Sequence, residues 1–273
     1  MTDYYSVQRS GALESLMAEI DRLQARIAEK KPLQPEKWQV VTEKLKMEWT
    51  CDSNAIEGST LTLGETIFFL REGLTVEGKP LKDFLDARNH ADAIDFLYEV
   101  VSNKRSLTEG LLKEINALLL KGVEFTEAVD PSGNKTKKKA TPGQYKKTPN
   151  TVLQLDGTIH AYTAPPQVPV EMEELIAWIE KNIDREHGVI TGSVAHYNMV
   201  RIHPFDDGNG RGARLLMNHI FMKKVLPPAV IRKEQRRNYL QTLAAGDNGD
   251  LSPFVSFVAQ SLVNTQKIIL EAL

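Results

Sequence analysis

The sequence predicts a mainly α-helical protein with one β-hairpin, and three observations support this. Apolar residues recur at spacings of three and four over most of the 273 residues, which is the pattern of amphipathic helices. One segment, residues 151–163, instead holds two strand-like runs on either side of Asp156-Gly157, a dipeptide typical of a two-residue hairpin turn. Strands and helices do not alternate along the chain and no internal repeat is present, so we expect no Rossmann sheet.

The N-terminal part of the chain predicts two amphipathic helices, followed by three further helical segments. The first helix has the apolar stripe Leu13, Leu16, Ile20, Leu23 and Ile27. Pro32 ends this helix, and Pro35 suits the first turn of the second, because the ring presets a helical φ and the missing N–H is not needed there. The apolar face of the second helix comprises Trp38, Val41, Leu45 and Trp49. After Gly58, helical spacing returns near residues 64–72, 82–101 and 107–121.

The segment before the hairpin is predicted to be an exposed loop. Residues 122–150 are poor in periodic apolar residues and contain Pro131-Ser132-Gly133-Asn134, followed by a basic run from Lys135 to Lys139. This run suits either a phosphate-binding patch or a solvated loop, and the lack of interleaved aromatic residues favours the loop. Beyond the hairpin, helical spacing leads up to His203 and continues near residues 211–224, 232–245 and 252–271.

Composition restricts the class of protein and its partners. Hydrophobic residues make up 41% of the chain and charged residues 26%, which is ordinary for a globular domain. A net charge of −2 favours neither nucleic acid nor an anionic membrane. The single cysteine, Cys51, excludes an intrachain disulfide and a cysteine-rich zinc site. The first residues form no apolar signal core and no run of 18 apolar residues occurs, so we expect a cytoplasmic protein.

The segment from His203 to Arg214, with the sequence HPFDDGNGRGAR, carries the clearest chemical signal. It lies between two predicted helices, so it is read as a loop that ends at a helix N-terminus. Gly208 and Gly210 allow the backbone to approach a ligand closely, because no Cβ stands in the way. The amides exposed where the helix begins, together with the helix dipole, form an anion site.

Four side chains in this segment complete a site for phosphoryl or nucleotidyl transfer. Arg211 and Arg214 are three positions apart, so both project from one face of the helix and can clamp two phosphates. Asp207 is placed to hold a Mg²⁺ that bridges phosphate oxygens, and His203 can act as a general base. A calcium loop is excluded because Arg211 stands where an oxygen ligand is required, and the segment also lacks the Walker and G-x-G-x-x-G patterns.

The same segment resembles a known family. It matches the pattern H-x-F-x-[D/E]-G-N-G-R-x-x-R of the Fic (filamentation induced by cAMP) family at every specified position, and His196 and Arg201 ahead of it are also similar. The resemblance spans roughly residues 50–260. It implies a Fic-type helical bundle in which the hairpin is a flap over the site, preceded by a helical extension. We therefore expect an N-terminal helical region over residues 1–60 and a catalytic core with C-terminal helices over residues 61–273.

The resemblance implies an enzyme that transfers AMP from ATP to a Ser, Thr or Tyr hydroxyl of a target protein. His203 would deprotonate the hydroxyl, and Asp207 would bind Mg²⁺, with Mn²⁺ as an alternative. The resemblance also implies an anion hole of Gly208, Asn209 and Gly210, with the Asn209 side-chain amide on the α-phosphate. Arg211 would contact the β-phosphate and Arg214 the γ-phosphate. Tyr239 and Leu243, with Asp247, would surround the adenine. For Tyr239 and Leu243, core packing is an equal alternative.

A second segment, Ser53 to Gly58, fits the inhibitory pattern [S/T]-x-x-x-E-[G/N] of the family. It precedes the catalytic segment, as in members whose inhibitory helix lies N-terminal to the core. The resemblance implies that Glu57 forms a bidentate pair with Arg214 and so takes the place of the γ-phosphate. ATP would then bind with its α-phosphate turned away from in-line attack.

Several alternatives stay open at this stage. The same site, with Glu57 orienting a water molecule, suits removal of AMP from a modified protein. A non-catalytic nucleotide sensor that presents its N-terminal helices to a partner is a further alternative, although an intact His203 argues against it. His196 and His219 are read as structural residues rather than metal ligands. The target protein is not encoded in any motif, so self-modification and a homo-oligomer are both open.

Overall fold

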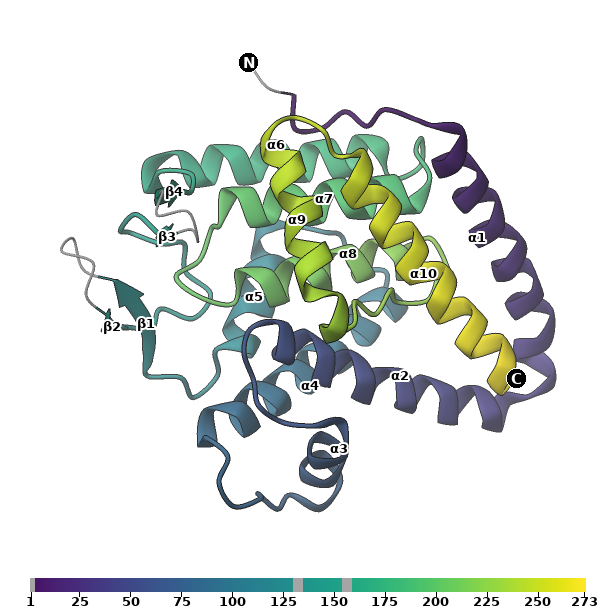
Figure 1. The fold of residues 1–273 in the computed structure, drawn as a ribbon, viewed down its shortest axis with the longest axis horizontal. Coiled ribbons are helices and arrows are strands. Elements are labelled where there is room, and N and C mark those ends of the chain that lie inside the picture. The colour runs from purple at the N-terminus through teal and green to yellow at the C-terminus, as the bar shows by residue number, and fades with distance from the viewer. Residues whose placement is uncertain (1–2, 130–134, 154–158) are drawn as a thin grey trace.

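The computed structural model describes residues 3–129, 135–153 and 159–273, and within these ranges the predicted mainly α-helical architecture is confirmed. The helices are α1 (Gly11–Lys30), α2 (Pro35–Ile56), α3 (Leu63–Glu72), α4 (Leu81–Ser102), α5 (Glu109–Leu119), α6 (Val168–Asn182), α7 (Gly188–Ile202), α8 (Asn209–Lys223), α9 (Arg236–Asp247) and α10 (Ser252–Ala272). Figure 1 shows α7 and α8 inside the bundle, with α1 lying along α10 at its edge.

The predicted hairpin is present. Strand β3 (Thr151–Leu153) pairs antiparallel with β4 (Ile159–Ala161), and Val152 lies opposite His160. The predicted turn at Asp156-Gly157 lies outside the described residues.

The prediction of an exposed loop over residues 122–150 is wrong for part of the segment. Strand β1 (Phe125–Val129) pairs antiparallel with β2 (Lys135–Lys139), so the basic run is a strand. The inward contacts of this second hairpin are polar: Thr126 is buried, and Lys138 donates to Asp206 at 2.6 Å. A hairpin that presents a threonine and a lysine on its inner face lacks the apolar alternation by which strands are recognised.

The close approach of α7 and α8 forms the centre of the core. Nearly every residue of α7 is buried, and so are most residues of α8. Gly192 allows this contact, because a Cβ at that position would meet the Phe221 ring at 2.4 Å. The loop that joins α7 to α8 therefore begins and ends on two helices that are fixed by packing.

Hydrophobic packing joins the N-terminal helices to the rest of the bundle. Helix α1 packs against α10 and buries four residues of its predicted stripe, with Leu16 partly buried. Helix α2 packs on α4, where Trp49 meets His90 edge-on at a centroid distance of 6.0 Å. Over the described ranges, no helix has the combination of length and apolar character that crossing a bilayer requires.

Acidification should weaken the fold through His219. This side chain on α8 is buried, and its burial, with a smaller effect of Lys223, lowers its pKa to about 4. Between about pH 4 and 6.5 the unfolded chain binds the proton and the folded chain does not, so stability rises with pH across that window. We expect the difference in unfolding free energy between the wild type and His219→Gln to shrink from pH 7 to pH 5. Urea titrations at each pH measure it, and an unchanged difference would contradict the prediction.

Candidate functional site

The site lies on the loop between α7 and α8. His203 ends α7 in the left-handed region, with φ 53° and ψ 59°, and its N–H donates to Met199 O at 3.0 Å. Gly208 caps α8 with φ 80°, which glycine adopts without strain. The chain thus turns sharply at both ends of a six-residue connection, and this brings the end of one central helix against the start of the next.

Two asparagines hold this loop from inside. The Asn209 side chain accepts from Phe205 N at 2.9 Å and donates to Phe205 O at 2.8 Å, while the Phe205 ring is fully buried. Asn116 of α5 donates to Asp207 O and accepts from Gly143 N, each at 2.9 Å. The Asn209 amide, which the family resemblance directs at a phosphate, therefore also fixes the loop. Asn116 was not among the predicted site residues, and its only sequence signal is a polar residue within an apolar helical stripe.

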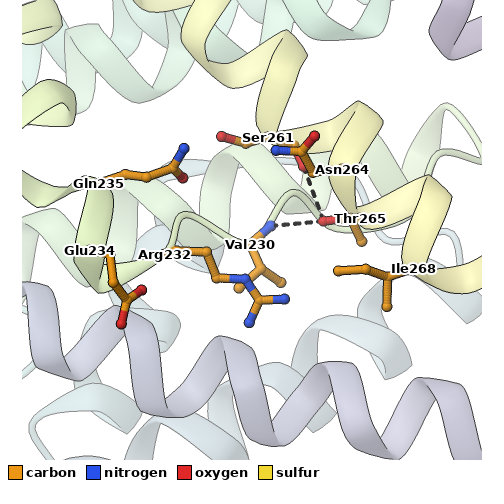
Figure 2. A pocket seen from close by; sticks show the side chains of 8 residues that line it. All are labelled: Val230, Arg232, Glu234, Gln235, Ser261, Asn264, Thr265 and Ile268. Atoms are coloured by element: carbon orange, nitrogen blue, oxygen red, sulfur yellow. Dashed lines mark hydrogen bonds between the residues drawn. The ribbon is translucent and has the colours of Figure 1, made fainter.

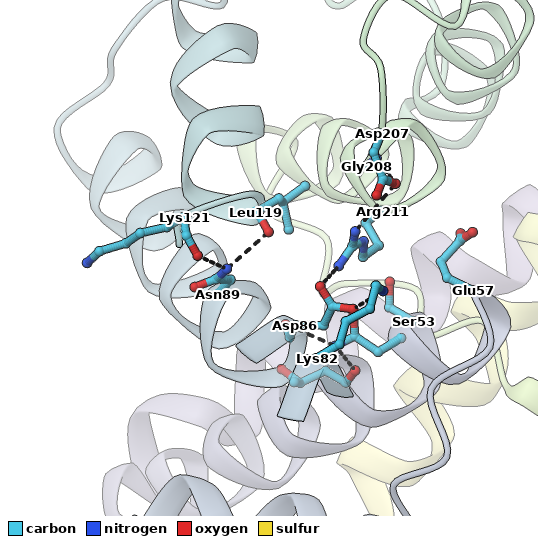
Figure 3. A network of polar contacts seen from close by, with 12 residues as sticks. Ser53, Glu57, Lys82, Asp86, Asn89, Leu119, Lys121, Asp207, Gly208 and Arg211 are labelled. Atoms are coloured by element: carbon cyan, nitrogen blue, oxygen red, sulfur yellow. Dashed lines mark hydrogen bonds and ion pairs between the residues drawn. The ribbon is translucent and has the colours of Figure 1, made fainter. Parts of the chain in front are cut away.

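Arg211 is buried, with 3% of its side chain exposed, and is paired inside the protein. Its Nη1 donates to Oδ1 of Asp86 in α4 at 2.7 Å, and Lys82 contacts the other oxygen of Asp86 at 2.6 Å (Figure 3). Burial alone would lower the pKa of Arg211, but the Asp86 and Asp207 carboxylates outweigh it and raise that pKa. Asp86 is a further residue that sequence reasoning missed.

Arg214 brings together four predicted site residues from three helices. Its guanidinium is 2% exposed. Nε donates to Ser53 Oγ at 2.9 Å, Nη2 donates to Ser53 O at 2.9 Å and to Glu57 Oε1 at 2.7 Å, and Nη1 lies 3.4 Å from Tyr239 OH. The contact between Glu57 and Arg214 is thus present, across 157 positions of sequence.

The expected bidentate geometry of this pair is wrong. Among the described contacts, a single oxygen of Glu57 reaches Arg214, because Ser53 takes Nε and shares Nη2. The Ser53 carbonyl is available because α2 ends here: Glu57 N–H bonds to Asn54 O instead of continuing the helical ladder. Gly58, with φ 102°, then turns the chain away. The carbonyls at the end of α2 carry the negative end of its dipole, which favours the arginine.

Glu57 lies directly over the start of α8. A Cβ at Gly210 would be 2.4 Å from Glu57 Oε1, so only glycine admits the carboxylate at this position. The Glu57 side chain is 42% exposed. Partial desolvation would raise its pKa, but the charge and hydrogen bond of Arg214 outweigh this and hold the pKa of Glu57 below its usual range. The carboxylate is therefore ionised at neutral pH.

The residue that follows the β3–β4 hairpin contacts His203. Tyr162, directly after β4, stacks on the imidazole with ring centroids 3.8 Å apart and planes inclined by 21°. The side chain of His160, on β4, lies outside the described residues. The hairpin thus lies beside the site, as expected of a flap.

Tyr239 and Leu243 lie one turn apart on α9 and are both buried. Tyr239 OH is 3.0 Å from Nε2 of His196, whose burial, with the charge of Arg214, holds its pKa well below the usual range. Leu243 belongs to the hydrophobic core. Asp247 accepts a hydrogen bond from Tyr197 OH at 2.9 Å. Tyr239 and Leu243 belong to the hydrophobic core, so both contribute to packing whether or not a base binds nearby.

A cavity of about 340 Å³ lies away from this loop (Figure 2). It is lined by Val230, Arg232, Glu234, Gln235, Ser261, Asn264, Thr265 and Ile268. Its polar groups largely bond within the protein: Thr265 accepts from Val230 N, and Arg232 pairs with Glu48 and Asp52 of α2. None of the predicted site residues lines it.

Asp207 is the one predicted metal ligand. Its Oδ1 accepts from Gly208 N at 2.5 Å and lies 3.7 Å from Arg211, and the carboxylate is partly exposed. Over the part of the chain that the structure describes, no three His, Cys, Asp or Glu side chains cluster as a ready metal site. A single carboxylate fits Mg²⁺, which commonly takes its remaining ligands from substrate phosphates and water.

Comparison with known proteins places this arrangement in a family. A model of the Fic/DOC family matches residues 106–221. A Fic domain-containing signaling protein from Bacteroides thetaiotaomicron is 30% identical and superposes with a TM-score of 0.80 over 96% of each chain. The chain belongs to the Fic family. A Fic family protein from Desulfovibrio desulfuricans is also similar in structure, at 26% identity and a TM-score of 0.75, over 98% of this chain and 77% of the other.

Among curated relatives of this Fic protein are two named protein adenylyltransferase Fic. The one from Nematostella vectensis is 32% identical over 215 residues, and the one from Culex quinquefasciatus is 30% identical over 224 residues. The matches cover 78% and 81% of this chain but only 46% and 41% of those proteins. The chain thus spans less than half the length of the curated relatives it matches.

Gly210→Ala should separate Glu57 from Arg214, because the new Cβ overlaps Oε1. In the wild type we expect Glu57→Gln to lower the free energy of unfolding by up to about 1 kcal/mol, the scale of a partly exposed charged hydrogen bond. In the Gly210→Ala background the same change should cost much less. Urea unfolding of the four proteins gives this double-mutant cycle.

Gly64→Ala is the matched control, because a Cβ at that helical glycine meets nothing within 4 Å. Glu57→Gln should cost as much in the Gly64→Ala background as in the wild type. An equal cost in the Gly210→Ala background as well would contradict the close contact of Glu57 with Gly210.

Proposed function

We propose that this protein transfers AMP from ATP to a Ser, Thr or Tyr hydroxyl of a target protein, and that Glu57 inhibits the transfer. The observation that carries the proposal is the Glu57 carboxylate on Arg214, directly over the glycine-rich start of α8. The adenylyltransferase names of the curated relatives support the reaction class. The chain itself is the first target to examine.

His203 is the base in this proposal. It takes the proton of the target hydroxyl, the oxygen forms a bond to the α-phosphorus of ATP, and the bond to pyrophosphate breaks. Stacking on Tyr162 supports the role, because it restrains the plane of an imidazole whose own ring torsion is soft. The hairpin that carries Tyr162 can add an extended target segment as a further strand, which registers a hydroxyl residue with little demand on sequence.

The start of α8 receives the phosphates. The amides of Gly208, Asn209 and Gly210 lie at the positive end of the helix dipole, which favours an anion. Arg211 and Arg214 supply further N–H donors, and both are paired with carboxylates that compensate their burial. Tyr239 and Leu243 are assigned to the adenine side, supported by the contact of Tyr239 with Arg214.

Inhibition follows from competition for one set of donors. A terminal phosphate that approaches Arg214 meets the Glu57 carboxylate, which already accepts from Nη2 and lies against Gly210. Two anions cannot share this site without strong repulsion, so ATP binds there in a productive pose only when Glu57 is displaced. The Ser53 contacts hold the guanidinium in place in either case.

Asp207 would hold Mg²⁺ together with phosphate oxygens of the bound ATP. The ion would supply positive charge against the phosphates. The hydrogen bond from Gly208 N to Asp207 Oδ1 and the Asn116 contact fix the carboxylate and its backbone at the rim of the loop.

Glu57→Gly should raise AMP incorporation on the order of 100-fold, because the α-phosphate then reaches in-line geometry. Incubation with α-labelled ATP and Mg²⁺, followed by mass spectrometry of the protein and of cell extract, measures the product. Adding His203→Ala to Glu57→Gly should abolish labelling. Glu77→Gly, at an exposed loop glutamate, is the control and should behave as the wild type. Labelling that persists without His203 would remove it as the base.

Asp207→Ala in the Glu57→Gly background should raise the half-saturating Mg²⁺ concentration at least about tenfold, the smallest loss usual for a weakened metal site. Titrating Mg²⁺ from a chelated start at saturating ATP measures the shift. Asp184→Ala, which removes an exposed carboxylate after α6, should leave the titration unchanged. Superimposable curves for Asp207→Ala and its parent would exclude Asp207 as the ligand.

A further inference from the structure

Lys146 is a buried lysine beside the catalytic loop that none of the roles above uses. It lies between β2 and β3, and 2% of the residue is exposed. Its neighbour Tyr145 forms an isolated antiparallel bridge with Phe205, so this stretch of chain runs directly along the loop from α7 to α8.

The contacts of Lys146 fall on both sides of His203. Its backbone N–H donates to Pro204 O at 2.9 Å, and its Nζ donates to Ile202 O at 3.3 Å. The carbonyl oxygens of the residues immediately before and after the proposed base are therefore bonded to a single residue. Its ammonium also lies 5.8 Å from the centroid of the Tyr162 ring that stacks on the imidazole.

A buried ammonium in this place is costly. Among the described residues no carboxylate lies within salt-bridge distance of Lys146 Nζ, although Lys138 close by is paired with Asp206. Burying a charge without an ionic partner is unfavourable because the charge loses its hydration, and an apolar side chain would fill the same space without that loss. Burial and the charge of Lys138 lower the pKa of Lys146 to about 8, so the cation persists at neutral pH.

The local features that favour a positive charge at Lys146 lie next to His203. Ile202 is the last residue of α7, and its carbonyl lies at the negative end of the helix dipole, where a cation is favourable. His203 follows in the left-handed region, which is strained because the Cβ comes too close to the following carbonyl oxygen. A conformation of this kind persists only when its surroundings hold it, and Lys146 bonds to the carbonyl of the residue on either side.

We propose that Lys146 is a positioning residue for His203: its backbone and ammonium together hold the left-handed turn that directs the imidazole into the site. Lys146 touches no reacting atom, so its removal alters the rate of the chemical step and leaves nucleotide binding intact. The inference rests on the proposed AMP transfer for its kinetic test, and a second measurement is independent of activity.

The kinetic test uses the Glu57→Gly protein with Lys146→Met, Lys146→Arg or Lys147→Met added. Lys146→Met should lower kcat about 100-fold, the effect of a misplacement near 1 Å, with KM for ATP within twofold. Lys146→Arg keeps a cationic donor and should recover at least tenfold of that loss. Lys147→Met removes the exposed neighbouring lysine and should change neither constant. A kcat within threefold of the parent for Lys146→Met would overturn the proposal, and so would a proportional change in KM.

The independent measurement is amide hydrogen exchange, followed by mass spectrometry, of peptides spanning residues 199–208 with Glu57 intact. Lys146→Met should speed exchange in this segment at least tenfold, whereas Lys147→Met should not. Unchanged exchange would overturn the proposal even if no AMP transfer is found. If Lys146→Met does not unfold cooperatively, Lys146→Gln replaces it under the same criteria. Absent AMP transfer in every protein, with faster exchange for the Lys146 variant, would refute the proposed function and leave the positioning role supported.

Discussion

The burial of the Arg214 guanidinium is the constraint on which the rest of this site depends. An arginine charge can remain inside a protein only if its N–H groups find acceptors. Here the acceptors come from the side chain and carbonyl of Ser53, from Glu57 and from Tyr239, on two helices other than α8. The relative positions of α2, α8 and α9 are therefore tied to one side chain, and the end of α2 cannot move away without leaving a buried charge unsatisfied.

The neighbouring Arg211 is also a buried arginine that needs acceptors inside the protein. Arg211 forms a buried ion pair with Asp86 of α4, and Lys82 contacts the other oxygen of that carboxylate. The two arginines, one turn apart on α8, thus each hold an acid from a different helix. A ligand phosphate that enters this place meets donors already oriented by the protein, which reduces the entropy lost on binding. It also meets the Glu57 carboxylate at Arg214, so in the proposed function phosphate binding and inhibition would arise from a single arrangement.

Much of this site follows from the sequence because it is local. The loop from His203 to the start of α8 is contiguous, and its glycines, acid and base have meanings that depend on spacing. The link from Glu57 to Arg214 came from the family resemblance and is confirmed as a contact. The Ser53 carbonyl, Asn116, Asp86 and Lys146 could not be predicted in the same way. A backbone carbonyl has no residue type to signal it, and a buried polar side chain in an apolar stripe acquires its meaning only from the partner opposite. The β1–β2 hairpin escaped prediction for the same reason, since its inner face is polar.

The partial exposure of Glu57 has a consequence for the time scale of control. The body of α2 is anchored one and two turns earlier, by buried Trp49 and by the pairs of Arg232 with Glu48 and Asp52. Release of the carboxylate therefore needs a rotamer change of one side chain, not a helix displacement. Rotamer changes of exposed side chains take picoseconds to nanoseconds, far faster than the turnover of ordinary enzymes. In the proposed function, such a restraint would stay at equilibrium with the ligands around it, and its effect would be graded by their concentrations.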